Sequence, residues 1–155
     1  MGDGFVTFIR FMMRILIING PNLNMLGQRR PEIYGGESFF DTLEILRNRF
    51  GAVEINYFQS NSEGDIIDRI QEVQVDGIVI NPGAYAHYSH AIADAIEACP
   101  RPVVEVHISN IFAREEFRAK TVTGRCANAV IAGCGRNGYA LAIEQILHIL
   151  NYDAR

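Results

Sequence analysis

Apolar and polar residues along the chain form blocks that predict strands alternating with amphipathic helices. Runs rich in branched apolar residues predict five strands, at residues 15–18, 52–58, 77–80, 102–107 and 129–132. The runs at 15–18 and 77–80 contain no polar side chain, which is typical of parallel strands buried on both faces.

The segments between these runs carry apolar residues at helical spacing. Residues 38–41 have the S/T-x-x-D/E form of a capped helix start, and apolar positions on one helical face follow at 39, 43, 46 and 50. The same spacing predicts three more helices, with inner faces that carry Ile66, Ile70 and Val73; Ile92, Ala95, Ile96 and Cys99; and Tyr139, Ile143, Ile146, Leu147 and Leu150.

Alternation of strand and helix predicts a parallel sheet covered by helices on both faces. Five strands favour the flavodoxin-like α/β fold, a doubly wound three-layer sandwich with strand order 2-1-3-4-5 and right-handed crossovers. At 155 residues the chain suffices for one such domain, which we expect to occupy residues 13–155. We interpret residues 1–12 as an extra N-terminal leader outside the core fold.

Composition narrows the classes of function. The formal net charge is −4, which argues against a general nucleic-acid or anionic-membrane surface. No apolar run approaches the roughly eighteen residues of a membrane span. The three cysteines show no C-x-x-C spacing, so we expect reduced thiols in a cytoplasmic protein.

Residues 19–36 form a long stretch without a regular period. A connection between strand and helix usually has about two to six residues, and longer ones in compact domains tend to be lids or binding loops. This stretch carries Asn22 near its start, Arg29 and Arg30 in its middle and Tyr34 near its end. A guanidinium beside Tyr34 would favour the phenolate, whereas an exposed tyrosine packing over Pro31 is the alternative.

Polar clusters also follow the third and fourth predicted strands, at residues 81–87 and 107–110. The first, third and fourth strands are consecutive in the proposed order, so their loops should meet in the crevice where open α/β sheets bind ligands. Glu105 and His107 share one face of their strand, so the carboxylate can orient the imidazole for general acid catalysis. A purely structural hydrogen bond is the equally weighted alternative.

Three further patterns leave alternatives open. Arg114 and Arg118 are spaced for one face of a short helix or turn, where they can bind an anionic ligand or pair with neighbouring glutamates at the surface. His87 and His90 have metal-ligand spacing, but no third ligand matches them, so we predict no metal. Residues 133–138 match G-x-G-x-x-G after the fifth strand, where a tight strand-to-helix turn is favoured over a dinucleotide site.

Three motifs together resemble the type II 3-dehydroquinate dehydratase family. They are Asn19-Gly-Pro-Asn-Leu-Asn-Met-Leu-Gly27, Asn81-Pro-Gly-Ala-Tyr-Ala-His87 and Glu105-Val-His-Ile-Ser-Asn-Ile-Phe-Ala-Arg-Glu-Glu-Phe-Arg118. The resemblance runs from about Met13 to Tyr152. It implies a cofactor-independent hydro-lyase of the shikimate pathway, which leads to aromatic amino acids. The implied reaction is the trans dehydration of 3-dehydroquinate to 3-dehydroshikimate through an enolate.

The resemblance also implies roles in the chemical steps. Tyr34 would accept the proton beside the ketone, and Arg29 would stabilise the phenolate and the transition state. Asn22 would position a water on the enolate oxygen. His107, oriented by Glu105, would protonate the departing hydroxyl. We expect Asn22 to be held at the strand end, and Arg29 and Tyr34 to become catalytic when the loop closes.

Further positions would bind the substrate or support the site. Asn81, His87 and Arg118 would bind ring hydroxyls, and Ile108 and Ser109 would bind the carboxylate largely through backbone N–H groups. In a second group, Arg114 would support the Tyr34 region, and Asp94 would reach the site of a neighbouring subunit in a trimer. Four trimers would make a homododecamer.

The chain departs from the family pattern at a few positions. Arg30 adds a positive charge where the family commonly has glutamate, and Ala86 and Tyr88 replace two threonines. Arg125 and Cys126 stand where small residues or proline are frequent. The alternative function is a non-catalytic flavodoxin-like module that binds a polyhydroxylated acid. It is less favoured, because a pure binder needs neither a base nor an acid.

Overall fold

The fold is a parallel β-sheet between two layers of helices, seen in a computed structural model that describes residues 12–28, 30–34, 36–72 and 74–151. The strands are β1 (Met13–Asn19), β2 (Val53–Gln59), β3 (Gly77–Asn81), β4 (Val103–His107) and β5 (Ala129–Ala132). All pairings are parallel, in the order β2-β1-β3-β4-β5. The predicted flavodoxin-like topology is therefore confirmed.

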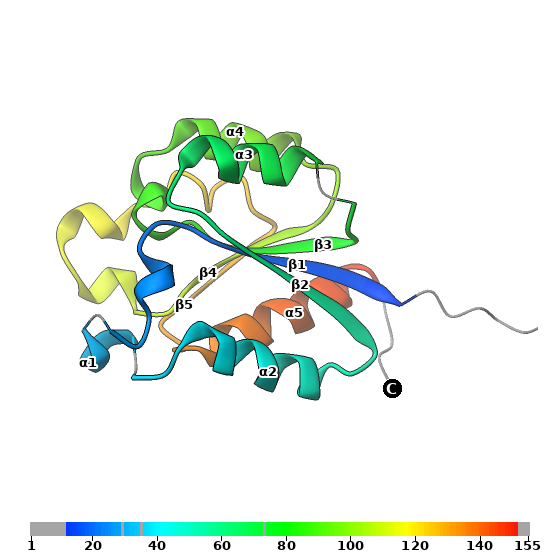
Figure 1. Cartoon of the computed structure of the whole chain (residues 1–155). Helices are drawn as coiled ribbons and strands as arrows, with labels where there is room; N and C mark the ends of the chain where they lie inside the picture. Colours follow the sequence, from blue (N-terminus) through cyan, green and yellow to red (C-terminus); the bar gives the residue numbers. More distant parts are fainter. Residues whose placement is uncertain (1–11, 29, 35, 73, 152–155) are drawn as a thin grey trace, which may run out of the picture.

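Two pairs of helices cover the two faces of the sheet (Figure 1). Helices α3 (Glu63–Glu72) and α4 (His90–Ala98) lie over one face, and α2 (Phe39–Arg49) and α5 (Asn137–Ile149) over the other. The one-turn helix α1 (Pro31–Tyr34) and four short 3-10 helices lie in the connections: η1 (Leu23–Met25), η2 (Gly83–His87), η3 (Ile111–Ala113) and η4 (Glu116–Ala119).

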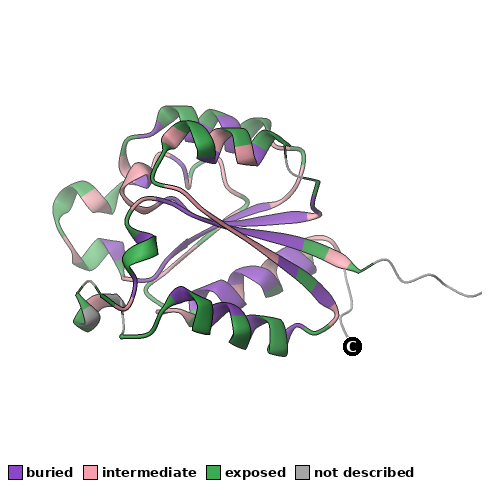
Figure 2. Cartoon of the chain, in the orientation of Figure 1, coloured by how far each residue is buried: buried purple, intermediate pink, exposed green. Residues whose placement is uncertain are grey.

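The core divides into two clusters because successive side chains of a strand point to opposite faces. Ile15 and Ile17 pack in the cluster under α2 and α5, whereas Leu16 and Ile18 pack in the cluster under α3 and α4. Each of these β1 side chains is fully buried, which contributes roughly 1.5–3 kcal/mol apiece. Figure 2 shows the result, with the central strands β1, β3 and β4 largely buried and the outer faces of the helices exposed.

Helix boundaries follow the predicted signals. The Asp41 carboxylate accepts the backbone N–H of Ser38 at 3.0 Å and its hydroxyl at 2.8 Å, so the predicted capped start of α2 is confirmed. The predicted inner face of this helix is buried as well, at positions 39, 43, 46 and 50. Val73, assigned to the inner face of α3, lies outside the described residues.

None of the described helices is long and apolar enough to cross a membrane. The expected leader at residues 1–12 falls almost wholly outside the described part of the chain, which starts at residue 12.

Candidate active site

A cavity of about 140 Å³ opens at the carboxyl ends of β1, β3 and β4, where the predicted polar loops meet. Its cationic lining consists of Arg30, Arg114 and Arg118, and no Asp or Glu belongs to the described lining. Such a cavity suits a small anion. The described residues that line it are Pro21, Asn22, Leu23, Met25, Leu26, Arg30, Asn81, Gly83, Ala84, His87, His107, Ile108, Ser109, Ile111, Arg114 and Arg118.

The loops after β1 and β3 are joined backbone to backbone. Gly20 donates its N–H to the Asn81 carbonyl at 2.8 Å, and a Cβ at Gly20 would lie only 2.5 Å from the Pro82 carbonyl oxygen. Only glycine therefore allows this approach. The contact fixes the position of Asn22 relative to Asn81.

Asn22 occupies the left-handed region, with φ of 67°. Its backbone N–H donates to Asn61 Oδ1 at 3.0 Å. Asn61 is itself held, since its Oδ1 accepts Gln59 Nε2 at 3.1 Å and its carbonyl accepts the Tyr85 hydroxyl at 2.8 Å. The Asn22 backbone is thus preorganised although its side chain is exposed.

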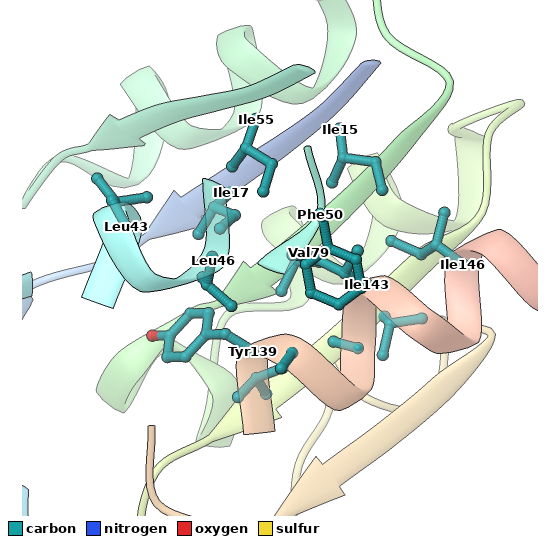
Figure 3. Packing of buried hydrophobic residues seen from close by; sticks show 14 of the residues in the cluster. Ile15, Ile17, Leu43, Leu46, Phe50, Ile55, Val79, Tyr139, Ile143 and Ile146 are labelled. Atoms are coloured by element: carbon teal, nitrogen blue, oxygen red, sulfur yellow. The ribbon is translucent and has the colours of Figure 1, made fainter. Parts of the chain in front are cut away.

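Asn81 belongs to a buried polar chain behind the cavity. Its Nδ2 donates to the Tyr139 hydroxyl at 2.9 Å, and that hydroxyl donates to Asn19 Oδ1 at 2.8 Å. Burial raises the pKa of Tyr139 far above its ordinary value, so the phenol keeps the proton that it donates. Figure 3 shows its ring inside the cluster under α2 and α5. Since Gly83 N–H occupies Asn81 Oδ1 at 3.1 Å, the orientation of this amide is defined.

His107 and Glu105 form the predicted pair on β4. His107 Nε2 lies 2.7 Å from Glu105 Oε1, and the two residues are 5% and 0% exposed. A carboxylate only accepts hydrogen bonds, so Nε2 carries the proton and Nδ1 is left for other partners. The prediction that Glu105 can orient His107 is geometrically satisfied.

His87 stacks against His107, with ring centroids 6.2 Å apart. Its Nδ1 lies 2.7 Å from the Lys120 carbonyl, which can only accept, so Nδ1 bears a proton. Burial lowers the pKa of His87 below its ordinary value, despite this hydrogen bond, and positive charge at His107 and Arg118 lowers it further. Neutral His87 then presents Nε2 as a hydrogen-bond acceptor for a hydroxyl group.

Arg114 and Arg118 both reach the cavity, but they do not share a helix. Arg114 has an extended backbone between η3 and η4, with Nη1 3.4 Å from Ser109 Oγ. Arg118 Nε donates to Glu115 Oε2 at 2.8 Å. Arg118 thus pairs with a surface glutamate and also lines the cavity, so the two roles that the sequence left as alternatives occur together.

The loop after β4 is held by the turn between β5 and α5. Gly133 N–H bonds the carbonyls of His107 and Ser109, at 3.2 and 3.1 Å, and Gly135 N–H bonds that of Ile108 at 3.0 Å. In a trans peptide the N–H points opposite to the carbonyl. The N–H groups of Ile108 and Ser109, which share peptides with the His107 and Ile108 carbonyls, therefore face away from this turn. With φ of 82° at Gly133, the glycines serve the tight turn that the sequence favoured.

Comparison with known proteins places these features in a family. A family model described as Dehydroquinase class II matches residues 13–147. The chain belongs to the class II dehydroquinase family.

Individual class II relatives match along nearly the whole chain. The 3-dehydroquinate dehydratase of Thermotoga neapolitana is 50% identical over 145 residues, covering 92% of this chain and 100% of that protein. That of Thermotoga maritima is 52% identical over 136 residues, covering 86% and 94%. The crystal structure of the type II dehydroquinase from Butyrivibrio crossotus superposes with a TM-score of 0.83 at 48% identity, covering 86% of this chain and 97% of that one.

The structure of this class II dehydroquinase brings most of the predicted site residues together. Those lining the cavity are Asn22, Asn81, His87, His107, Ile108, Ser109, Arg114 and Arg118, with Glu105 directly behind His107. Arg29 and the side chain of Tyr34 lie outside the described part, although the backbone of Tyr34 ends α1. Asp94 is exposed on α4 and does not line the cavity.

The departures from the family pattern differ in their relation to the cavity. Arg30 lines it, with φ of 45° and an ion pair to Glu32 at 3.3 Å. Ala86 is fully buried and Tyr88 is 60% exposed, and neither belongs to the lining. Among these three departures, Arg30 is thus the one that adds a charge to the cavity lining.

Sequence reasoning missed the residues that support the site from behind, namely Asn61, Thr121, Thr123 and Tyr139. Tyr139 was predicted only as an apolar position on a helix face. One signal was present, because a tyrosine on a fully buried face needs a polar partner for its hydroxyl. Which partner it finds depends on the tertiary fold.

Proposed function

We propose that this class II dehydroquinase dehydrates 3-dehydroquinate to 3-dehydroshikimate with the side chains around the cavity. The family match and the relatives named 3-dehydroquinate dehydratase support this hydro-lyase reaction, which belongs to the shikimate pathway. The observation that carries the proposal is the buried His107–Glu105 pair facing a cavity lined by three arginines. An acid and an anion-binding surface thus lie at one small site.

In the first step, the Tyr34 phenolate removes the proton from the carbon beside the ketone, with Arg29 stabilising the phenolate. The electron pair of the broken C–H bond forms an enolate. Asn22 holds a water that donates to the enolate oxygen, so that charge is stabilised where it develops.

In the second step, the enolate collapses and the C–O bond on the adjacent carbon breaks. His107 acts as an imidazolium hydrogen-bonded to Glu105 and delivers its Nδ1 proton to the leaving hydroxyl, which departs as water and leaves the imidazole neutral. One C–H bond and one C–O bond break, while a carbon–carbon double bond and an O–H bond of the released water form. Tyr34 gains one proton and His107 loses one, and exchange with solvent restores both, so the balance needs no oxidant, reductant or cofactor.

The substrate is held by groups of matching polarity. Neutral His87 accepts from a ring hydroxyl, and Asn81 and Arg118 bind the other hydroxyls. The backbone N–H groups of Ile108 and Ser109 bind the carboxylate. Arg114, next to Ser109, supports the side of the cavity toward Tyr34.

We also propose the assembly that the resemblance implied, a dodecamer of four trimers. Asp94 lies exposed on α4 and away from its own cavity, as a residue that completes a neighbour's site must. Sedimentation tests this, because an active monomer would contradict a role for a neighbour's Asp94. Three free cysteines agree with the predicted cytoplasmic location.

The test of the reaction is to mix the protein with 3-dehydroquinate and follow the conjugated enone in the ultraviolet. We expect a steady rise in absorbance that persists with a chelator and is absent in Tyr34→Phe. A wild-type trace no steeper than that of Tyr34→Phe would overturn the enzyme function. The family match and the named relatives disfavour the non-catalytic binding module, which would bind 3-dehydroquinate without the absorbance change.

A further inference from the structure

Glu105 is fully buried, and its carboxylate is surrounded by donors from one short segment. Oε1 lies 2.7 Å from the Thr121 hydroxyl as well as 2.7 Å from His107 Nε2, and Oε2 lies 2.6 Å from the Thr123 hydroxyl. A buried carboxylate is costly unless its oxygens are hydrogen-bonded. The two threonines thus supply hydrogen bonds that solvent cannot.

The direction of these hydrogen bonds follows from the number of protons. Each hydroxyl has one proton, and the two threonine oxygens lie 3.2 Å apart, farther from each other than from Glu105. Gly124 N–H donates to Thr121 Oγ1 at 2.9 Å, so this oxygen already accepts one bond. Both protons are therefore donated to the carboxylate of Glu105.

The segment that carries the threonines is fixed against the site. Val122 N–H donates to the Ala86 carbonyl at 2.8 Å, and the Lys120 carbonyl accepts from His87. Thr123 is fully buried, and a Cβ at Gly124 would lie 2.8 Å from Thr121 Cγ2 and 3.1 Å from Glu105 Oε1. The hydroxyls thus have little freedom to point elsewhere.

We propose that Thr121 and Thr123 are positioning residues that hold the Glu105 carboxylate aimed at Nε2 of His107. Without these donors, the buried carboxylate loses two of its hydrogen bonds and can rotate away from the ring. With them, Glu105 accepts the hydrogen bond from Nε2–H, fixes the orientation of the ring and leaves Nδ1 to serve the substrate. The inference rests on the proposed role of His107 as proton donor.

The test compares Thr123→Val, which replaces the hydroxyl with a methyl group, with Thr123→Ser, which keeps the hydroxyl. We expect kcat to fall about tenfold or more in Thr123→Val, the order expected for losing a hydrogen bond to a charged group, with KM within about twofold. Thr123→Ser should retain most of kcat. The proton NMR signal of His107 Nε2–H, assigned by its absence in His107→Gln, should shift in Thr123→Val and stay in place in Thr123→Ser.

The outcomes separate this inference from the proposed function. An inactive wild type would overturn the function, whereas the NMR comparison would still test the hydrogen bonds. An active wild type with unchanged kcat and an unchanged Nε2–H signal in Thr123→Val would overturn the inference. So would an equal loss of kcat in both variants. If Thr123→Val does not fold, the same measurements on Thr121→Val and Thr121→Ser decide.

Discussion

The two sides of the cavity are built differently. One side, here called the floor, consists of Asn81, Glu105 and His107 at the ends of β3 and β4, which are 4%, 0% and 5% exposed. The other side, here called the arm, is the segment 20–36, in which Asn22 and Arg30 are exposed. Figure 1 shows α1 of the arm standing away from the sheet.

The two sides also differ in how they are held. The floor side chains of Asn81 and Glu105 are held by hydrogen bonds from remote parts of the chain, Tyr139 and Thr123, and Glu105 in turn holds His107. In the arm, Asn22 is fixed only through its backbone, and Arg30 pairs with its near neighbour Glu32. The floor can thus hold an acid in one geometry before substrate arrives, whereas the described arm side chains of Asn22 and Arg30 have no such remote hydrogen bonds. Floor substitutions should therefore change stability and activity together, whereas arm substitutions should change activity alone.

The largest effect is expected for His107→Gln on the floor. Glutamine can still donate to Glu105, but it has no titratable proton to deliver to the leaving hydroxyl. We expect kcat to fall by about 10²–10⁴-fold, the range for loss of a general acid. Steady-state kinetics in the enone assay checks this, and a loss below tenfold would remove His107 from the chemical step.

Asn22→Gly tests the arm with a smaller expected loss. Glycine adopts φ of 67° without steric penalty, and this gain offsets the greater freedom of glycine in the unfolded chain, so the free energy of unfolding should stay within about 0.5 kcal/mol of the wild-type value. Losing the amide that holds the water should lower kcat about 10- to 100-fold, a weaker effect than removing a direct oxyanion donor. Urea unfolding and kinetics measure both, and a less stable variant would contradict the independence of the arm.

Tyr139→Phe tests the floor by changing a residue that does not itself line the cavity. It removes the partner of two buried amide atoms, Asn81 Nδ2 and Asn19 Oδ1, so the free energy of unfolding should fall by about 1–3 kcal/mol. KM should also rise several-fold, because the Asn81 amide then keeps only its hydrogen bond from Gly83 and is held less firmly. Tyr57→Phe is the matched control, since its hydroxyl makes only a 3.5 Å contact with Asn19. Equal effects in the two variants would contradict the role of Tyr139.

The smallest effect is a pH dependence from His87. Its lowered pKa keeps it neutral at pH 7, so KM should stay constant from pH 8 to about 6.5 and rise only below that value. In His87→Gln, KM should be higher but should lack this rise. The free energy of unfolding should also fall as pH drops below about 6.5. The reason is that His87 takes up a proton at higher pH in the unfolded chain than in the folded one, so protonation favours the unfolded state. A variant with the wild-type pH profile would assign the titration to another group.

Local patterns predicted the sheet and part of the floor. The apolar runs gave strand positions within a few residues of those observed for β1 and β3, because burial on both faces leaves a direct signal. The Glu105–His107 pair was predictable because residues two apart on a strand share a face.

Other features depend on contacts that no local pattern encodes. Thr123 reaches Glu105 across 18 residues, and Tyr139 reaches Asn81 across 58. The sequence predicted Arg114 and Arg118 on one face of a short helix or turn, and both line the cavity, but from a segment that divides into two 3-10 turns. The Asn110 side chain accepts Phe112 N–H at 3.2 Å and starts the first of them, a local competition with helix formation.

The central claim is that the arm supplies the base and the floor supplies the acid. It is tested most directly by incubating 3-dehydroquinate in D₂O with His107→Gln or Tyr34→Phe, and measuring deuterium in the recovered substrate by mass spectrometry. Buffer without protein gives the background rate. We predict that His107→Gln, with its base intact, exchanges the proton beside the ketone while forming little product, and that Tyr34→Phe stays at background. Exchange in Tyr34→Phe as fast as in His107→Gln would contradict the assignment of the base to the arm.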